Sequence, residues 1–202
     1  MSTVVSRTEA HDDAAPHARP LAWYGMVFFI ASEAVFFANL IAAYLYLRVR
    51  DGASFNPIGS THAELDTALA AVNTVILLSS SIPMHLAGRS IARGNRRGLK
   101  IWLPATIILG AAFVSIQLYE YINNGFGPDR GAVGSTFYVL TGFHGAHVTA
   151  GIILLLVCFF RALRGDFTKD RHFAVTAGEM YWHFVDAVWI VLFTSLYVLQ
   201  AK

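Results

Sequence analysis

The chain carries five long apolar stretches separated by shorter polar segments. A helix needs about 20 apolar residues to cross the ~30 Å hydrocarbon core of a bilayer. Each stretch is long enough, and none shows the alternation of apolar and polar positions that marks a strand of a membrane barrel. The pattern therefore predicts an all-α integral membrane bundle of five transmembrane helices. They span roughly residues 21–47, 68–88, 101–119, 136–160 and 180–200.

The composition agrees with burial in lipid. Hydrophobic residues make up 55% of the chain and charged residues 14%, whereas soluble domains carry about 25% charged residues. The net charge of +2 gives no argument for nucleic acid as a partner, and we expect none. The single cysteine, Cys158, lies in an apolar run, which excludes an internal disulfide and predicts a small packing residue.

Residues 1–20 differ from the rest of the chain. They are polar, mixed in charge and end in Pro20. They contain no apolar core of signal-peptide length. We predict a flexible cytoplasmic N-terminal tail over residues 1–20, followed by a single transmembrane helical domain over residues 21–202.

The basic residues predict the orientation. With five spans, the N-terminal tail and the connectors after the second and fourth helices lie on one side of the membrane. That side carries eleven of the fifteen Lys and Arg residues, and the other side carries four. Cytoplasmic segments are enriched in Lys and Arg, so the N-terminus is predicted to be cytoplasmic and the C-terminus outside.

One acidic residue lies deep in the first predicted helix. Glu33 is about 16 Å from the start of that helix at 1.5 Å per residue, which is near the midplane of the bilayer. Burial at this depth favours the neutral acid. Carboxyl groups inside membranes are often functional, so Glu33 is a candidate proton-linked group. The alternative is a protonated glutamate that only hydrogen bonds to a neighbouring helix.

Histidines form a second candidate feature. His144 and His147 are three residues apart on the fourth predicted helix, so both lie on one helix face. Such a pair could supply two metal ligands if other helices supplied the rest. A two-histidine match is a weak signal, and buried histidines bonded to backbone or to carboxylates are the favoured interpretation.

The fifth predicted helix carries a polar stripe. Glu179, His183 and Asp186 follow the helical spacing that brings side chains onto one face. His183 could bridge the two acids or reach the histidine pair, and a satisfied intramembrane polar network is predicted. Glu120 and His85 lie nearer helix ends, so their side chains are expected to extend toward the membrane interface.

Five segments, taken in order, resemble one known family. They are SEAVFF around Glu33, NTVILLSSS at 73–81, GSTFYVLTGFHGAHVTAG at 134–151, CFFRALRGDFT at 158–168 and YWHFVDAVWIVLFTSLY at 181–197. In this order they resemble subunit III of the haem–copper respiratory oxidases. The resemblance runs from about residue 21 to the end. It implies the five-helix form of that family, which lacks the first two helices of the seven-helix form.

The resemblance implies an accessory role without a redox centre. It implies a cytochrome c oxidase of a bacterial-type plasma membrane, which pumps protons while reducing oxygen to water. This chain would pack on subunit I, with subunit II in the same complex. It would support proton uptake and protect the enzyme from inactivation during turnover. It implies no catalytic residue, haem, copper or other metal in this chain.

The resemblance also assigns roles to individual residues. The family holds structural phospholipids in a V-shaped cleft, and the arginine that meets their headgroups falls on Arg161. The family's buried, carbodiimide-reactive carboxyl falls on Glu33. The histidine pair falls where the family has no redox metal. Aromatic side chains such as Phe36, Phe37 and Phe143 are expected to offer apolar walls for acyl chains.

Three alternatives remain open. The chain could be subunit III of a quinol oxidase, although SEAVFF and YWHFVDAVW look more like the cytochrome c branch. It could be a stand-alone proton-linked transporter with Glu33, Glu179 and Asp186 as its relay, although the sequence lacks the internal inverted repeat common in transporters. It could be a membrane metalloenzyme built on its histidines, which metal analysis would decide.

Overall fold

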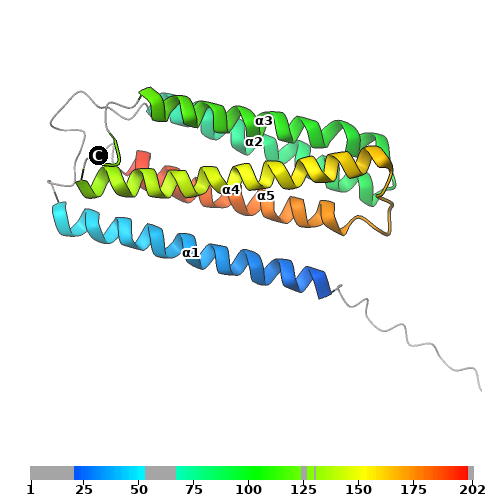
Figure 1. Cartoon of the computed structure of the whole chain (residues 1–202), viewed down its shortest axis with the longest axis horizontal. Coiled ribbons are helices and arrows are strands. Elements are labelled where there is room, and N and C mark those ends of the chain that lie inside the picture. The colour runs from blue at the N-terminus through cyan, green and yellow to red at the C-terminus, as the bar shows by residue number, and fades with distance from the viewer. Residues whose placement is uncertain (1–20, 53–66, 124–126, 130, 200–202) are drawn as a thin grey trace, which may run out of the picture.

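The computed structural model describes residues 21–52, 67–123, 127–129 and 131–199. Within these ranges the chain forms long helices and no strand (Figure 1). The helices are α1 (Leu21–Asp51), α2 (Thr67–Ala92), α3 (Arg96–Asn123), α4 (Gly131–Arg164) and α5 (Phe173–Phe193), and α5 continues into a π-helical segment, η2 (Thr194–Val198). The tail predicted over residues 1–20 lies outside the described residues.

The five predicted membrane helices are confirmed, and each is longer than predicted when η2 is counted with α5. Even the 26 residues of α2 measure about 39 Å at 1.5 Å per residue, which exceeds the ~30 Å hydrocarbon core. The largest difference is at α5, which begins at Phe173 and not near residue 180. Hydropathy detects the part of a helix that lies in lipid, whereas the helices continue beyond it into their polar ends.

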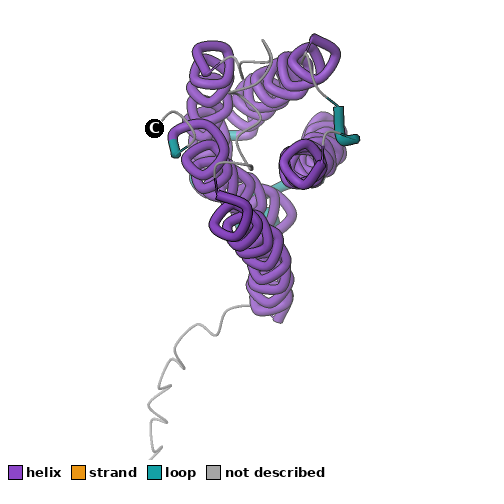
Figure 2. Tube along the Cα trace, turned by 90° about the vertical axis from the view of Figure 1, so that its left-hand side faces the viewer, coloured by secondary structure: helices purple, strands orange, loops and turns teal. Residues whose placement is uncertain are grey.

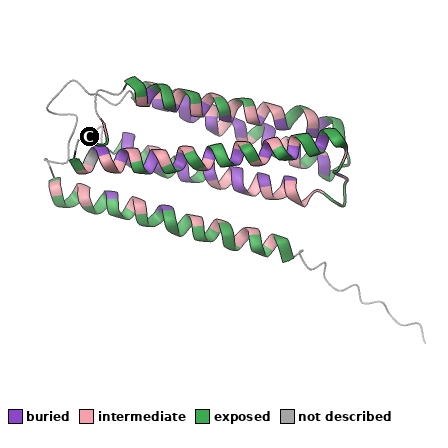
Figure 3. Ribbon diagram, viewed as in Figure 1, coloured by how far each residue is buried: buried purple, intermediate pink, exposed green. Residues whose placement is uncertain are grey.

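Four helices pack into one bundle and α1 lies against its side (Figures 1 and 2). α1 packs mainly against α4 and α5. In the most apolar 18-residue window of α5, 56% of residues are buried inside the chain, compared with 6% in α1. Figure 3 shows the same contrast. α5 is therefore the central helix, and α1 leaves most of its surface for lipid or for another subunit.

Two glycines end helices at the same end of the bundle. Gly94 follows α2 and Gly165 follows α4, and both have positive φ. At Gly165 the backbone N–H groups of residues 165 and 166 bond to the carbonyls of residues 162 and 161, which is the Schellman arrangement. Gly94 and Asn95 repeat it on Ile91 and Ser90. Both connectors that carry the basic residues therefore begin with a tight turn.

Two buried tryptophans of α5 bond to hydroxyl groups of α2. Nε1 of Trp182 donates to Oγ of Ser80 at 2.8 Å, and Nε1 of Trp189 donates to Oγ1 of Thr74 at 2.9 Å. Both indole rings are fully buried. Because a buried N–H without a partner is costly, these two bonds fix the pairing and the register of α2 and α5.

Candidate functional site

The carboxyl group of Glu33 on α1 contacts a histidine on α4. Its Oε2 lies 3.0 Å from Nε2 of His147, and both side chains are largely buried. Nδ1 of His147 lies 2.7 Å from the carbonyl oxygen of Phe143. The aromatic ring of Phe37 packs against the imidazole, with ring centroids 4.9 Å apart. The structure thus brings Glu33 together with one member of the predicted histidine pair.

The contacts of His147 define how many protons this pair holds. A carbonyl oxygen only accepts hydrogen bonds, so Nδ1 carries a hydrogen and donates it to Phe143. The remaining contact, between Nε2 and Glu33, needs one proton between two acceptor atoms. That proton sits either on the carboxyl group or on the imidazole. Glu33 on α1 and His147 on α4 therefore share one proton.

His144 does not join this pair. Its ring is 1% exposed and stacks on Trp189 of α5 with centroids 4.8 Å apart. The edge of Phe113 on α3 covers another side. Neither ring nitrogen has a hydrogen-bond partner within the described residues. The two histidines therefore contact different helices, and the structure does not bring them together as a pair of ligands.

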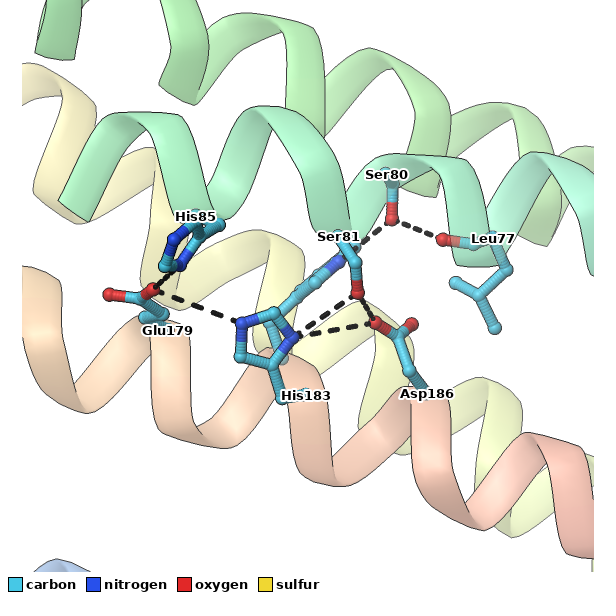
Figure 4. Close-up of polar contacts among 8 residues, drawn as sticks. Leu77, Ser80, Ser81, His85, Glu179, His183 and Asp186 are labelled. Carbon is cyan, nitrogen blue, oxygen red and sulfur yellow. Dashed lines mark hydrogen bonds and ion pairs between the residues drawn. The ribbon is translucent and has the colours of Figure 1, made fainter. Parts of the chain in front are cut away.

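A second polar group joins α2 and α5. We call it the α2–α5 polar cluster; its members are Ser81, His85, Glu179, His183 and Asp186. Figure 4 shows the Glu179 carboxylate joined by dashed lines to the imidazoles of His85 and His183, with His183 also facing Ser81 and Asp186. The sequence pattern identified the three α5 residues, and the structure shows that His183 contacts both acids and not the α4 histidines.

The distances within this cluster are short. Oε1 of Glu179 lies 3.0 Å from Nδ1 of His85 and 3.9 Å from Nε2 of His183. On its other side, Nδ1 of His183 lies 3.2 Å from Oγ of Ser81. The Ser81 hydroxyl donates to Oδ2 of Asp186. Sequence spacing could not reveal Ser81 and His85 as members, because both come from another helix.

Arg161 lies in the last turn of α4, at the end where the basic connectors begin. Its Nε is 3.4 Å from Oδ2 of Asp166, and its guanidinium lies 5.0 Å from the centre of the Phe167 ring. The side chain is 47% exposed. These two contacts direct the guanidinium along the surface while leaving donors accessible to another group.

Glu120 was expected at the membrane interface, and the structure corrects this. Its side chain is buried inside the chain, and α3 continues beyond the predicted end, to Asn123. Oε1 accepts from the Tyr197 hydroxyl at 3.0 Å, and Oε2 accepts from Nε2 of Gln117 at 3.3 Å. The signal that could have found this site is the helical spacing of Phe113, Gln117 and Glu120 along one face.

An apolar groove separates part of α1 from α4. Its lining is almost wholly apolar and consists of Leu40, Ala43, Ser135, Thr136, Val139 and Leu140. Near it, the ring of Phe36 on α1 meets Phe143 on α4 with centroids 5.1 Å apart, and both rings are partly exposed. Phe37, which was expected to line a lipid cleft, is instead buried.

Within the described residues, five helices are long and apolar enough to cross a membrane, and they define the class of this molecule. The chain is a multi-pass helical membrane protein in which Glu33, Glu120 and Glu179 contact neighbouring helices.

Comparison with known proteins identifies the family. The model of the family "Cytochrome c oxidase subunit III" matches residues 5–201. A cytochrome c oxidase subunit 3 from Thermostichus vulcanus is 39% identical over 98% of this chain and 94% of the relative. One from Synechocystis sp. is 42% identical over 95% of this chain and 80% of the relative. One from Loxodonta africana is 39% identical over 86% of this chain and 68% of the relative.

The chain belongs to the cytochrome c oxidase subunit III family. This confirms the resemblance stated from the sequence motifs, and it makes the chain a membrane-embedded member of an oxidase complex.

Proposed function

We propose that this chain is the accessory, non-redox subunit III of a proton-pumping terminal oxidase that takes electrons from cytochrome c. It packs on subunit I, with subunit II in the same complex, in a bacterial plasma membrane. The observation that carries this proposal is the family match over residues 5–201, together with relatives named for cytochrome c oxidase and not for a quinol oxidase.

The position of α1 supports a role in holding phospholipid. The groove between α1 and α4 is apolar, as acyl chains require. Arg161 lies at the basic end of the bundle, where its free guanidinium donors can meet an anionic phosphate. Ordered lipid here stabilises the complex during turnover. Arg161 lies about 31 Å along α4 from Leu140, the nearest residue of the groove, so the arginine and the groove would hold lipids of opposite leaflets.

The basic connectors support the proposed orientation. Both described connectors that carry the excess of Lys and Arg lie at the same end of the bundle as Arg161, and this end is cytoplasmic in the proposal. The Glu33–His147 pair then lies on the path between the two membrane faces. A pair that shares one proton can pass it on, which supports a contribution to proton uptake.

One experiment tests the proposal directly. The chain, tagged and purified from native membranes in mild detergent, is examined by a reduced-minus-oxidised haem spectrum and by oxygen uptake. The expected result is a haem a signal with uptake driven by reduced cytochrome c. Uptake driven only by a quinol would assign the chain to a quinol oxidase instead.

A chain that purifies without haem or any large partner would contradict the proposal. The control for dissociation in detergent is chemical cross-linking in the membrane before solubilisation. If cross-linked samples also lack haem and partners, the stand-alone transporter becomes the better explanation.

A further inference from the structure

We propose that the α2–α5 polar cluster is a binding site for a divalent transition-metal ion of the zinc class, held by His85, Glu179 and His183. The ligand atoms of these three side chains all lie within 4.8 Å of one another. Among the described residues, no other group of three histidine, cysteine or acidic side chains comes this close. The site goes beyond the proposed function, because it needs no haem, no lipid and no partner subunit.

The donor set selects the kind of metal. Two imidazoles and one carboxylate match the ligands of zinc sites that keep an open fourth position. Imidazole nitrogen favours zinc and copper over magnesium and calcium, which prefer oxygen ligands alone. At a tetrahedral zinc with ligand bonds of about 2.0–2.1 Å, ligand atoms lie about 3.3 Å apart. The three donors therefore need to approach by at most about 1.5 Å.

The hydrogen bonds of His183 prepare one ring nitrogen for a metal. The Ser81 hydroxyl donates its hydrogen to Asp186, so its oxygen accepts from Nδ1–H of His183. Nε2 is then left with its lone pair, and it faces Glu179. Metal-bound histidines commonly donate their second N–H to such a partner, which sets the tautomer and the ring orientation. Ser81 and Asp186 are therefore positioning residues.

The neighbouring helix leaves room for the carboxylate. Gly88 lies on α2, three residues after His85. A Cβ added at Gly88 would collide with the carboxylate of Glu179. The absence of a side chain at residue 88 lets Glu179 reach across to His85.

The site is accessible from the basic end of the bundle. Glu179 is six residues from the start of α5 and His85 is seven from the end of α2, which is roughly 9–10 Å at 1.5 Å per residue. The side chain of His85 is 57% exposed in this chain, which leaves room for a fourth ligand. A divalent ion held by two neutral imidazoles would also balance the charge of the Glu179 carboxylate.

Equilibrium dialysis against buffered free zinc tests the proposal. The wild-type protein is purified with whatever subunits accompany it, and its zinc content per chain is compared with that of His85→Gln and Glu179→Gln. Zinc bound by other subunits contributes equally to wild type and variants, so it cancels when their zinc contents are subtracted. The expected result is the loss of one zinc ion per chain in both variants. The matched control is His172→Gln, because His172 precedes α5 and contacts Thr168, outside the cluster.

A positioning variant separates a built site from a chance one. Asp186→Asn leaves the three ligands in place, and we expect it to weaken zinc binding about 10- to 100-fold with the stoichiometry unchanged. Equal zinc content in wild type, His85→Gln and Glu179→Gln would overturn the proposal. Because His85 is exposed, His85→Gln is informative even if Glu179→Gln folds poorly. Zinc content is measured independently of haem. A failure of the zinc-site proposal is therefore distinguishable from a failure of the proposed function.

Discussion

A single methyl group at Gly110 should destabilise the bundle. Gly110 on α3 faces the indole ring of Trp182, and a Cβ added there would lie 2.5 Å from Cη2 and 2.9 Å from Cζ2 of that ring. Non-bonded carbon atoms are normally about 3.5–4.0 Å apart. The Gly110→Ala variant therefore requires Trp182 or α3 to move by about 1 Å.

Trp182 has little freedom to move. Its ring is fully buried, and its Nε1 is bonded to Ser80 of α2. On the side of α4, Cζ3 and Cε3 lie 3.0 and 3.1 Å from the position that a Cβ on Gly151 would occupy. Overpacking of this kind costs about 1–3 kcal/mol, and alanine recovers about 0.5–1 kcal/mol of helix propensity. We expect a net loss of about 1–2 kcal/mol.

The loss can be measured as thermal stability in detergent. For a chain of this size 1 kcal/mol shifts Tm by about 2–4 °C, so Gly110→Ala should lower Tm by about 2–8 °C, read as the folded fraction on size exclusion after heating. The matched control is Gly145→Ala, because nothing lies within 4 Å of a Cβ at Gly145 within this chain. Its Tm should stay at or above that of the wild type.

A double mutant identifies the cause. Trp182→Phe removes the two ring atoms that collide with the new methyl group, so it should cost less in the Gly110→Ala background than in the wild type, by about 0.5–3 kcal/mol. Wild-type stability of Gly110→Ala, or strictly additive effects in the double mutant, would refute the reasoning.

Three further substitutions test other contacts. Glu33→Gln should leave assembly with the haem-containing subunits intact, because an amide can still contact His147; loss of the chain from the purified complex would count against this. Arg161→Ala should lower the phospholipid content of the complex and speed its inactivation during turnover, with Arg164→Ala as the control; equal lipid content and equal inactivation rates would contradict it. Tyr197→Phe should lower the free energy of unfolding by about 1–3 kcal/mol, because the bond to buried Glu120 is lost; an unchanged Tm would show that the bond contributes nothing.

The sequence predicted the membrane helices because their signal is local. Each span needs only its own run of apolar residues, and the five runs are found in the structure with extended ends. Most of the predicted ends were too short because polar residues such as Arg161 and Glu179 also belong to the helices. Glu120, which the sequence placed near a helix end with its side chain toward the interface, is instead buried against Tyr197 and Gln117.

The partners of the polar residues could not be predicted in the same way. Spacing along a helix shows which residues share a face, and it correctly grouped Glu179, His183 and Asp186. It cannot show which other helix that face meets. Glu33 contacts α4 and Glu179 contacts α2, although neither partner is adjacent in sequence. The same limit explains why His144 and His147, three residues apart, contact different helices.

Polar side chains supply the specificity that hydrophobic burial cannot supply in lipid. Apolar helix faces gain little by leaving lipid tails for each other, so directional contacts decide which helices pair. In this chain Glu33 links α1 to α4, Glu179 links α5 to α2, and Glu120 links α3 to η2. Asn73 links α2 to α3, and the Tyr121–Thr141 contact links α3 to α4. Each helix is therefore joined to another by at least one polar side chain. Of these links, the contact between Glu179 and His85 belongs to the proposed zinc site, and the bonds of Trp182 and Trp189 join the same two helices independently of it.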